Sequence, residues 1–583
     1  MKGQSTALDT VGTFQHEYID ILPSNWTTVS VLMNEDATEL WLCRYHSGEL
    51  PFILRLPMSR KSEEQFDDSE PFTYRAAHEE LMNIIRLSDL SCHNPPDPAA
   101  KGGKSGWWKE REELDRRLEG LLKSVEDMWL GGFKSVFSLH DRRSDLLARF
   151  RKSFDSILDR HLPSRQGKQT KKNQPILHSH ILDLLVGLDA GPEVEENLDD
   201  DVMDILFFVV DTVRWNGEAN AHDEVDFDAM TVETIDALQS YHEAAGTTDA
   251  QDAFDKHLIL RLDKRLHLFP WESLPCLQNK SITRVTSLVQ LRDRILNMRQ
   301  VSSLDLDRYH VARKNGTTLL NPSSDLVRTE ATLSPQLALL KEQHDWSVYA
   351  QHKPSQPEFV SFLEQSNALL YFGHGSGTQY IGERSIQRLK KCADVVWLMG
   401  CSSGKVQTWG ELESESVPLS YLLAGEDVDC DTQESQGSAA KMRQGMCMSV
   451  VATLWDVTDR DIDNFSMSVA KKWGLFGERK MPTAGTKRGE GTVEEPAVPK
   501  TPARKGRAPK TPAKTPRTPA KMATKVPKRN TKKKTVEIPD DDEEQGEKMS
   551  LATAVARSRD VCYLRYLNGA ASVVYGIPTY LGD

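Results

Sequence analysis

Long apolar runs are missing from this chain of 583 residues. The longest uninterrupted run covers residues 205–210, whereas a helix that spans a membrane needs about 20 predominantly apolar residues. The beginning of the chain also lacks an apolar stretch behind a basic start, which is the pattern of a secretory signal. The sequence therefore predicts neither a transmembrane segment nor a signal peptide.

Cysteine is scarce and irregularly spaced. Eight cysteines without a CxxC pair do not form a disulfide framework, and no zinc-type spacing is present. Free thiols in a reducing compartment are the default. HExxH and P-loop motifs are absent, and the pair His178 and His180 would point apart on a helix. We therefore predict neither a metal site nor a cofactor.

Charge is unevenly distributed along the chain. The formal net charge is −13, yet residues 479–535 hold 18 Lys and Arg against three Glu, which makes this segment +15 and the remainder −28. Residues 479–547 are basic and proline-rich at first and then acidic. Such a composition predicts a disordered linker. Because strand and helix patterns resume after it, the linker is interpreted as an insertion within a domain. The polar residues 425–443 are interpreted as a surface loop.

The patterning changes three times along the chain, which is long enough for two or three domains. Short apolar segments at 29–33, 40–43 and 51–56 predict an antiparallel start. From about 71 to 246 the period is helical, most clearly at 108–122, 146–158, 176–188 and 202–213. In the last third, apolar strands alternate with helices, which predicts a mainly parallel sheet covered on both faces. Its expected strands are 317–321, 346–349, 368–372, 395–399, 449–454 and 572–576.

Two of these strands run into reactive groups. His374 follows 368–372 between Gly373 and Gly375, and Cys401 follows 395–399 after Gly400. Ligands of parallel sheets bind at the carboxyl ends of the strands, and an imidazole beside a thiol can produce a thiolate nucleophile. Taken alone, His374 would more often be structural. The matched, glycine-flanked placement of the pair favours a hydrolase with a His–Cys dyad.

The order of His374 and Cys401 along the chain restricts the class of hydrolase. All sixteen histidines lie at or before His374, so none follows Cys401. An arrangement in which the base lies far downstream of the nucleophile is therefore excluded for Cys401. The other cysteines in apolar surroundings are interpreted as small core residues: Cys43, Cys276, Cys392, Cys447 and Cys562.

Several segments resemble separase, the caspase-like protease that opens cohesin rings at anaphase. The most specific is 454–463, which reads Leu-Trp-Asp-Val-Thr-Asp-Arg-Asp-Ile-Asp. The resemblance is dense from about 257 to 583, apart from the linker and the 425–443 loop, and it is thin over the helical region. Its other segments are 269–275, 320–325, 329–330, 367–377, 395–404 and 566–578.

The resemblance implies an α/β fold with two domains. A pseudo-protease, substrate-binding sheet domain (1–315) with a helical insert (about 71–246) would precede an active caspase-like domain (316–583). His374 would be the general base, Cys401 the nucleophile, and the backbone N–H groups of Gly375 and Cys401 the oxyanion hole. Full-length separases carry a long helical-repeat region that this chain lacks, so we expect a carboxy-terminal fragment or a short member.

The resemblance also implies a substrate and partners. Separases cleave the kleisin subunit of cohesin after Arg and are held by securin-type inhibitors, in the cytoplasm and nucleus and on mitotic chromatin. An arginine needs a carboxylate partner. We expect Asp456, after the strand 449–454, to be that partner, with Trp455 as a wall and Glu413 and Asp459 as weaker candidates. For Asp459, Asp461 and Asp463 the favoured interpretation is that they cap and solvate the following helix.

A second function class remains open. The chain would then be a non-catalytic chromatin scaffold with a relic protease fold, bound to DNA through the 479–535 segment without sequence preference. The presence of both His374 and Cys401 favours the peptidase, because a relic would be expected to have lost one of them.

Overall fold

The computed structural model describes residues 11–60, 72–93, 103–166, 175–189, 197–246, 255–301, 307–407, 410, 414–425, 445–477 and 549–582. The predicted linker 479–547, nearly all of the 425–443 loop and Glu413 lie outside these residues. In the described part of the chain, no helix combines the length and the apolarity that a membrane crossing requires.

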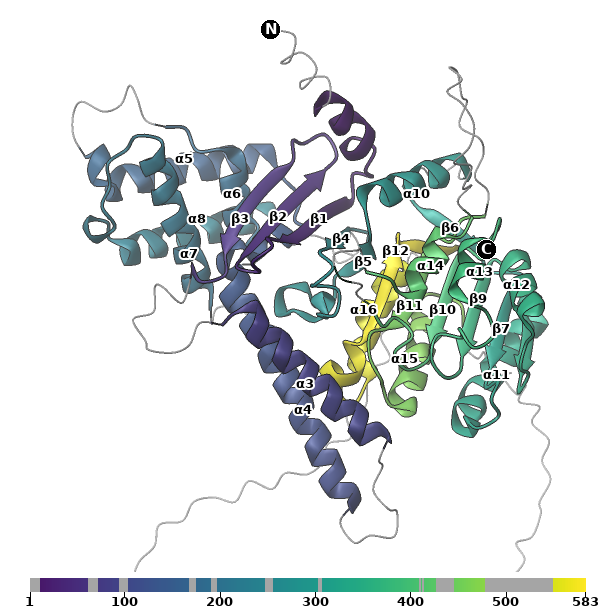
Figure 1. Ribbon diagram of the computed structural model, residues 1–583. Helices are drawn as coiled ribbons and strands as arrows, with labels where there is room; N and C mark the ends of the chain where they lie inside the picture. Colours follow the sequence, from purple (N-terminus) through teal and green to yellow (C-terminus); the bar gives the residue numbers. More distant parts are fainter. Residues whose placement is uncertain are drawn as a thin grey trace, which may run out of the picture. The chain divides into compact units, whose positions relative to one another are not determined.

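A sheet of eleven strands organises the described residues (Figure 1). Its order is β3 (Phe52–Pro57), β2 (Glu39–His46), β1 (Trp26–Met33), β4 (His257–Leu262), β5 (Ser281–Val285), β12 (Ser572–Gly576), β11 (Ser449–Thr453), β10 (Val395–Met399), β9 (Ala368–Phe372), β7 (Gly316–Leu320) and β8 (Ser347–Ala350). The pairs β1–β2, β2–β3 and β11–β12 are antiparallel, and the other seven pairs are parallel. A separate parallel pair joins β6 (Tyr309–Ala312) to β13 (Thr579–Gly582).

Both faces of the carboxy-terminal strands are buried. Alternate residues of β10 enter two different hydrophobic clusters, because successive side chains of a strand point to opposite faces. One face is covered by α12 (Gln356–Gln365), α13 (Glu383–Gln387) and α14 (Val417–Leu423). The other is covered by α10 (Leu288–Val301), α11 (Val327–His344), α15 (Asp459–Lys472) and α16 (Leu551–Ser558). The predicted mainly parallel α/β fold is confirmed.

The helical region lies between β3 and β4 in the chain. It contains α3 (Tyr74–His93), α4 (Gly103–Val125), α5 (Ser144–His161), α6 (Ser179–Val186), α7 (Leu198–Trp215) and α8 (Phe227–Ala245). Helices α3 and α4 form a long hairpin (Figure 1). The strands before and after residue 315 belong to one sheet, joined where β5 pairs with β12. The predicted division into a pseudo-protease and an active domain remains a prediction.

Candidate active site

Two glycine loops meet at one edge of the sheet. Strands β9 and β10 are parallel neighbours, with Phe372 opposite Met399, so the loops that follow them emerge together. A Cβ on Gly400 would lie 2.4 Å from the carbonyl oxygen of Gly373 and 2.2 Å from that of Gly375. These distances leave room for hydrogen alone. Glycine at position 400 therefore allows the two loops to pack backbone against backbone.

His374 is held by its backbone and by its ring. The Tyr371 hydroxyl donates to the carbonyl oxygen of His374 at 2.7 Å. The ring Nε2 lies 2.9 Å from Oδ2 of Asp325, and 54% of the side chain is exposed. The Asn321 side chain shapes the loop that carries this carboxylate, because its Oδ1 accepts from the backbone N–H groups of Asp325 and Leu326. Asp325 ends the segment 320–325, for which the sequence predicted no catalytic role.

Cys401 is half-buried and faces a different partner. Its Sγ donates to the carbonyl oxygen of Val457 at 3.3 Å. Burial raises the pKa of the thiol to about 12, and the carboxylates of Asp456 and Asp459 add to that rise, whereas the backbone of Val457 opposes it. Among the described residues, no hydrogen bond joins His374 to Cys401. The two candidate residues thus follow neighbouring strands of the sheet, and each is hydrogen-bonded to another partner.

The two amides proposed for the oxyanion hole are available. Gly375 has φ of +62°, a left-handed conformation that glycine adopts without strain. Neither its N–H nor that of Cys401 donates to another residue that the structure describes. Both amides belong to the loops that Gly400 brings together.

The predicted arginine pocket remains a prediction, and its candidate residues lie in different surroundings. Asp456 lies close to Cys401: its Oδ1 accepts from the hydroxyl of the adjacent Ser402 at 2.5 Å, and 18% of its side chain is exposed. Trp455, expected to wall the pocket, is 1% exposed, and its Nε1–H donates to Leu567 in the core, so it offers no surface there. Asp459 is exposed in the first turn of α15. Glu413 lies outside the described residues.

Asp461 and Asp463 differ from their predicted roles. Both are buried, at 2% and 3% exposure, instead of solvating α15. Asp461 accepts from the side-chain amide of Asn568 at 2.7 Å, and Asp463 accepts from the Thr329 hydroxyl at 3.1 Å. Burial raises the pKa of Asp463 to about 6. The expectation that these two carboxylates are solvated is therefore wrong.

The end of α3 reaches the same place, which the sequence did not indicate. His93 Nε2 lies 3.9 Å from Oδ2 of Asp456. Burial and the charge of Asp456 raise the pKa of Asp89 to about 6. No local pattern relates residues 89–93 to residue 456, so only the folded structure shows that the helical region borders the site.

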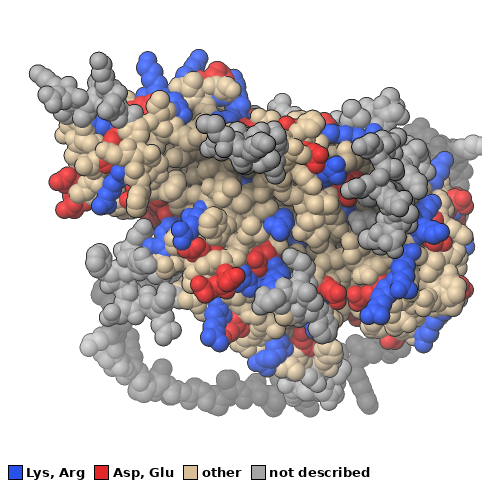
Figure 2. All heavy atoms as spheres, turned by 45° about the horizontal axis from the view of Figure 1, so that its top comes forward, with Lys and Arg blue, Asp and Glu red and all other residues tan. Residues whose placement is uncertain are grey.

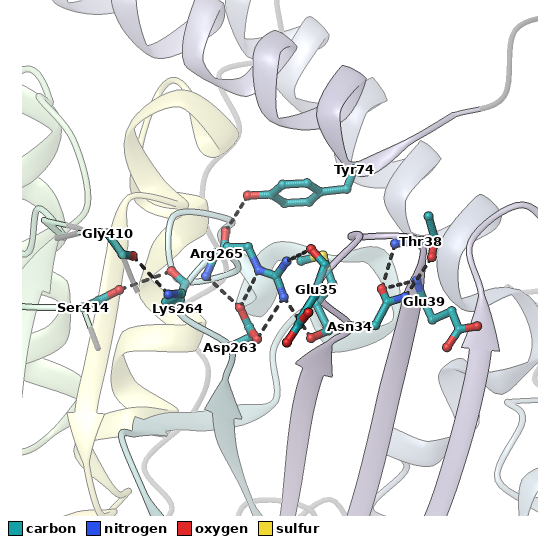
Figure 3. A network of polar contacts seen from close by, with 11 residues as sticks. Asn34, Glu35, Thr38, Glu39, Tyr74, Asp263, Lys264, Arg265, Gly410 and Ser414 are labelled. Carbon is teal, nitrogen blue, oxygen red and sulfur yellow. Dashed lines mark hydrogen bonds and ion pairs between the residues drawn. The ribbon is translucent and has the colours of Figure 1, made fainter. Parts of the chain in front are cut away.

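Gly410 and Ser414 contact the turn that follows β4, in the amino-terminal half of the sheet (Figure 3). Lys264 Nζ donates to the carbonyl oxygen of Gly410 at 3.1 Å, and the Ser414 hydroxyl donates to the Lys264 carbonyl at 3.4 Å. The neighbouring Arg265 binds Asp263 and the carbonyl oxygen of Met33.

Among the described residues, no three His, Cys, Asp or Glu side chains are grouped in a way that could hold a metal ion. The rings of His178 and His180 do not point apart as expected: their centroids are 4.7 Å apart, because His178 precedes α6 as its N-cap. A cavity of about 530 Å³ lies between β2, β3 and the helical region, and none of the predicted site residues lines it.

Comparisons with known proteins agree on one family. A sequence model described as "Separin, protease domain" matches residues 35–462. The chain is 39% identical over 568 residues to separin of Emericella nidulans, covering 97% of this chain and 23% of that protein. It is 33% identical over 571 residues to separin of Schizosaccharomyces pombe, covering 98% and 26%. The chain thus spans about a quarter of the length of these curated relatives.

Solved structures agree with this result. The Saccharomyces cerevisiae separase–securin complex at 2.6 Å resolution matches with a TM-score of 0.73 and 26% identity, over 98% of this chain and 31% of that one. A second structure of that complex, at 3.0 Å resolution, also gives a TM-score of 0.73.

Proposed function

This chain belongs to the separin protease-domain family, and from that premise we propose that it is a cysteine endopeptidase in which Cys401 attacks and His374 moves the proton. The observation that carries this proposal is the packing of Gly400 against the backbone of Gly373 and Gly375, which brings the two loops together. No metal or cofactor enters the proposed reaction.

The proposed reaction begins when the Cys401 thiol leaves the Val457 carbonyl and gives its proton to the imidazole. Asp325 accepts from Nε2 of His374, so Nδ1 is the nitrogen that remains to take this proton. The thiolate then forms a bond to the scissile carbonyl carbon. The N–H groups of Gly375 and Cys401 bind the oxyanion, and the imidazolium gives its proton to the leaving amine. Water subsequently hydrolyses the thioester.

Substrate choice follows from the carboxylate beside the nucleophile. Asp456 is partly exposed next to Ser402, and a guanidinium matches a carboxylate through two parallel hydrogen bonds. We therefore propose cleavage after Arg, with the kleisin subunit of cohesin as substrate and a securin-type protein as inhibitor. The structural relative is a separase–securin complex, which supports the inhibitor class. This role would place the protein in the cytoplasm and nucleus, and on mitotic chromatin.

One experiment tests the activity directly. The chain is incubated with a fluorogenic peptide that ends in Arg, beside Cys401→Ala and Cys447→Ala variants. Cys447 is fully buried before β11 and serves as the matched control. We expect Cys401→Ala to lose several orders of magnitude in rate and Cys447→Ala to keep it. Appreciable activity in Cys401→Ala together with loss in Cys447→Ala would show that the nucleophile is misassigned.

We also propose that residues 479–535 bind nucleic acid, because their net charge of +15 suits phosphate neutralisation. The segment lies outside the described residues. On the face that Figure 2 displays, acidic and basic side chains are interspersed, so this face offers no comparable basic surface. DNA binding is measured against salt for the intact chain and for a deletion of 479–547. If the intact chain and the deletion variant bind DNA with equal affinity and equal salt dependence, the segment is only a spacer. DNA binding without peptidase activity would favour the scaffold.

A further inference from the structure

A chain of hydrogen bonds that includes the side chain of Asn568 connects the helical region to the segment that holds Cys401. Helix α4 packs against the π-helical turn η10 (Arg565–Gly569), which Figure 1 shows beside the α3–α4 hairpin. Asp115 Oδ1 on α4 accepts from the backbone N–H groups of Tyr566 at 3.0 Å and Leu567 at 2.7 Å. Two amides of η10 are thus anchored on a carboxylate of the helical region.

A second contact between α4 and η10 is buried. Arg111, 0% exposed, donates from Nη2 to Oδ1 of Asn568 at 3.2 Å. Its other terminal nitrogen binds the hydroxyl of Ser91 at 2.7 Å and Sγ of Cys92 at 3.1 Å, both on α3. The guanidinium therefore ties both helices of the hairpin to Asn568. The orientation of the Asn568 amide is fixed as a result, because its oxygen faces a donor that is always charged.

The amide nitrogen of Asn568 faces the segment that leads from β11 into α15. Nδ2 donates to the Thr458 hydroxyl at 3.1 Å and to Oδ2 of Asp461 at 2.7 Å. Next to it, the carbonyl oxygen of Leu567 accepts from Trp455 at 2.8 Å. Asn568 itself is 2% exposed, so each of these bonds is shielded from water and costly to leave unmade. The turn η10 thus holds the segment 455–461 through hydrogen bonds to Trp455, Thr458 and Asp461.

That segment in turn holds the nucleophile. The carbonyl oxygen of Val457 accepts from Cys401 Sγ, that of Trp455 accepts from the Ser402 N–H at 3.2 Å, and Asp456 accepts from the Ser402 hydroxyl. Ser402 has φ of +53°, which a residue other than glycine keeps only when its surroundings enforce it. Residues 455–457 thus contact Cys401 and its neighbour Ser402 through three hydrogen bonds.

We propose that Asn568 is a positioning residue for Cys401: its side chain links helix α4 to Thr458 and Asp461, which follow the segment 455–457 that holds the nucleophile. The proposal rests on the proposed peptidase function. It assigns the helical region a share in the geometry of the site, through contacts made by residues more than four hundred positions away in the sequence. Because small displacements of reacting groups reduce rates strongly, loss of the Asn568 contacts should act on turnover more than on substrate affinity.

The test uses the whole chain with Asn568→Ala and two readouts. We expect kcat on an Arg peptide to fall by about tenfold or more, with KM nearly unchanged. Iodoacetamide should modify Cys401 several-fold faster, because a loosened 455–458 segment exposes a thiol whose pKa is raised mainly by burial. Catalysis and thiol reactivity thus change in opposite directions. The alkylation readout needs no cleavable substrate, so it remains informative if the peptidase proposal fails.

The matched control is Tyr563→Phe, which removes the bond from the Tyr563 hydroxyl to Glu112 at the exposed side of the same interface. We expect this variant to keep wild-type kinetics and alkylation. Should Asn568→Ala not fold, Asp115→Ala, which releases the two η10 amides, is expected to give the same signature. Unchanged kcat and unchanged Cys401 modification in the folded variants would refute the proposal. The proposal would also be refuted if Asn568→Ala accelerated the alkylation of the fully buried Cys447 as much as that of Cys401. Such a result would indicate that the whole fold has become more open.

Discussion

Substituting Gly400 by alanine tests the central geometry of the site. The added methyl group would lie 2.2 Å and 2.4 Å from two carbonyl oxygens of the His374 loop, whereas ordinary contacts of a Cβ begin at about 3.4 Å. The obstructing atoms are backbone, so no side chain can rotate away. The loops must separate by about 1 Å, and a misplacement of that size typically costs about a hundredfold in rate.

The assay is kcat/KM on an Arg peptide, accompanied by thermal unfolding. We expect Gly400→Ala to lose about two orders of magnitude, equivalent to about 2.7 kcal/mol of transition-state stabilisation. Overpacking should also lower the free energy of unfolding by about 1–3 kcal/mol. Gly382→Ala is the control, because a Cβ at that position meets nothing within 4 Å. A folded Gly400→Ala variant with the activity of this control would refute the assignment of the two loops to one site.

Three further substitutions have defined outcomes. Asp325→Asn should lower kcat about tenfold or more with little change in KM, because the His374 ring loses its orienting carboxylate; an unchanged kcat would remove Asp325 from the mechanism. Asp456→Asn should raise KM for Arg peptides, and an unchanged KM would move the pocket elsewhere. The folded-state pKa of Asp463 is about 6, above its ordinary value of 3.8, so the folded chain binds the proton more tightly and loses stability as pH rises from about 4 to 6. Asp463→Asn should therefore add about 3 kcal/mol to the free energy of unfolding above pH 6 and nothing below pH 4, as measured by denaturation at both pH values.

The strands that carry the dyad were predictable because their signal is local. Strands β9 and β10 are apolar runs that end at glycine, and they span the expected residues 368–372 and 395–399. Strand β11 lies beside β10. This neighbourhood was expected, because Asp456 follows the strand 449–454 and was predicted to lie near Cys401. The antiparallel start was predicted as well, although β1 also pairs in parallel with β4. Strand β5 was missed because its residues Thr283 and Arg284 interrupt the apolar pattern and are satisfied only by burial.

The surroundings of Trp455, Asp461 and Asp325 depend on contacts that are mostly distant in the sequence. The polar edge of Trp455 is satisfied by Leu567, 112 residues away, which no local pattern reveals. For Asp461 a signal was present: it lies four residues before Phe465 and eight before Val469, both buried on α15, so it shares their inward face. Charge suggested solvation, but helical spacing indicated burial. The role of Asp325 depends on the neighbouring strands β7 and β9, and therefore appears only in the assembled sheet.

The position of β12 in the sheet constrains how the chain is made. This strand lies between β5 and β11, and it is translated about a hundred residues after β11. Until residue 576 has left the ribosome, β5 and β11 each present an open edge of unpaired backbone groups, which is a template for wrong pairing. The site also stays incomplete in this period, because the residues of η10 that hold 455–461 arrive with the same late segment. A ribosome-bound chain that stops before β12 therefore combines two exposed strand edges with a segment 455–461 that lacks its contacts to η10.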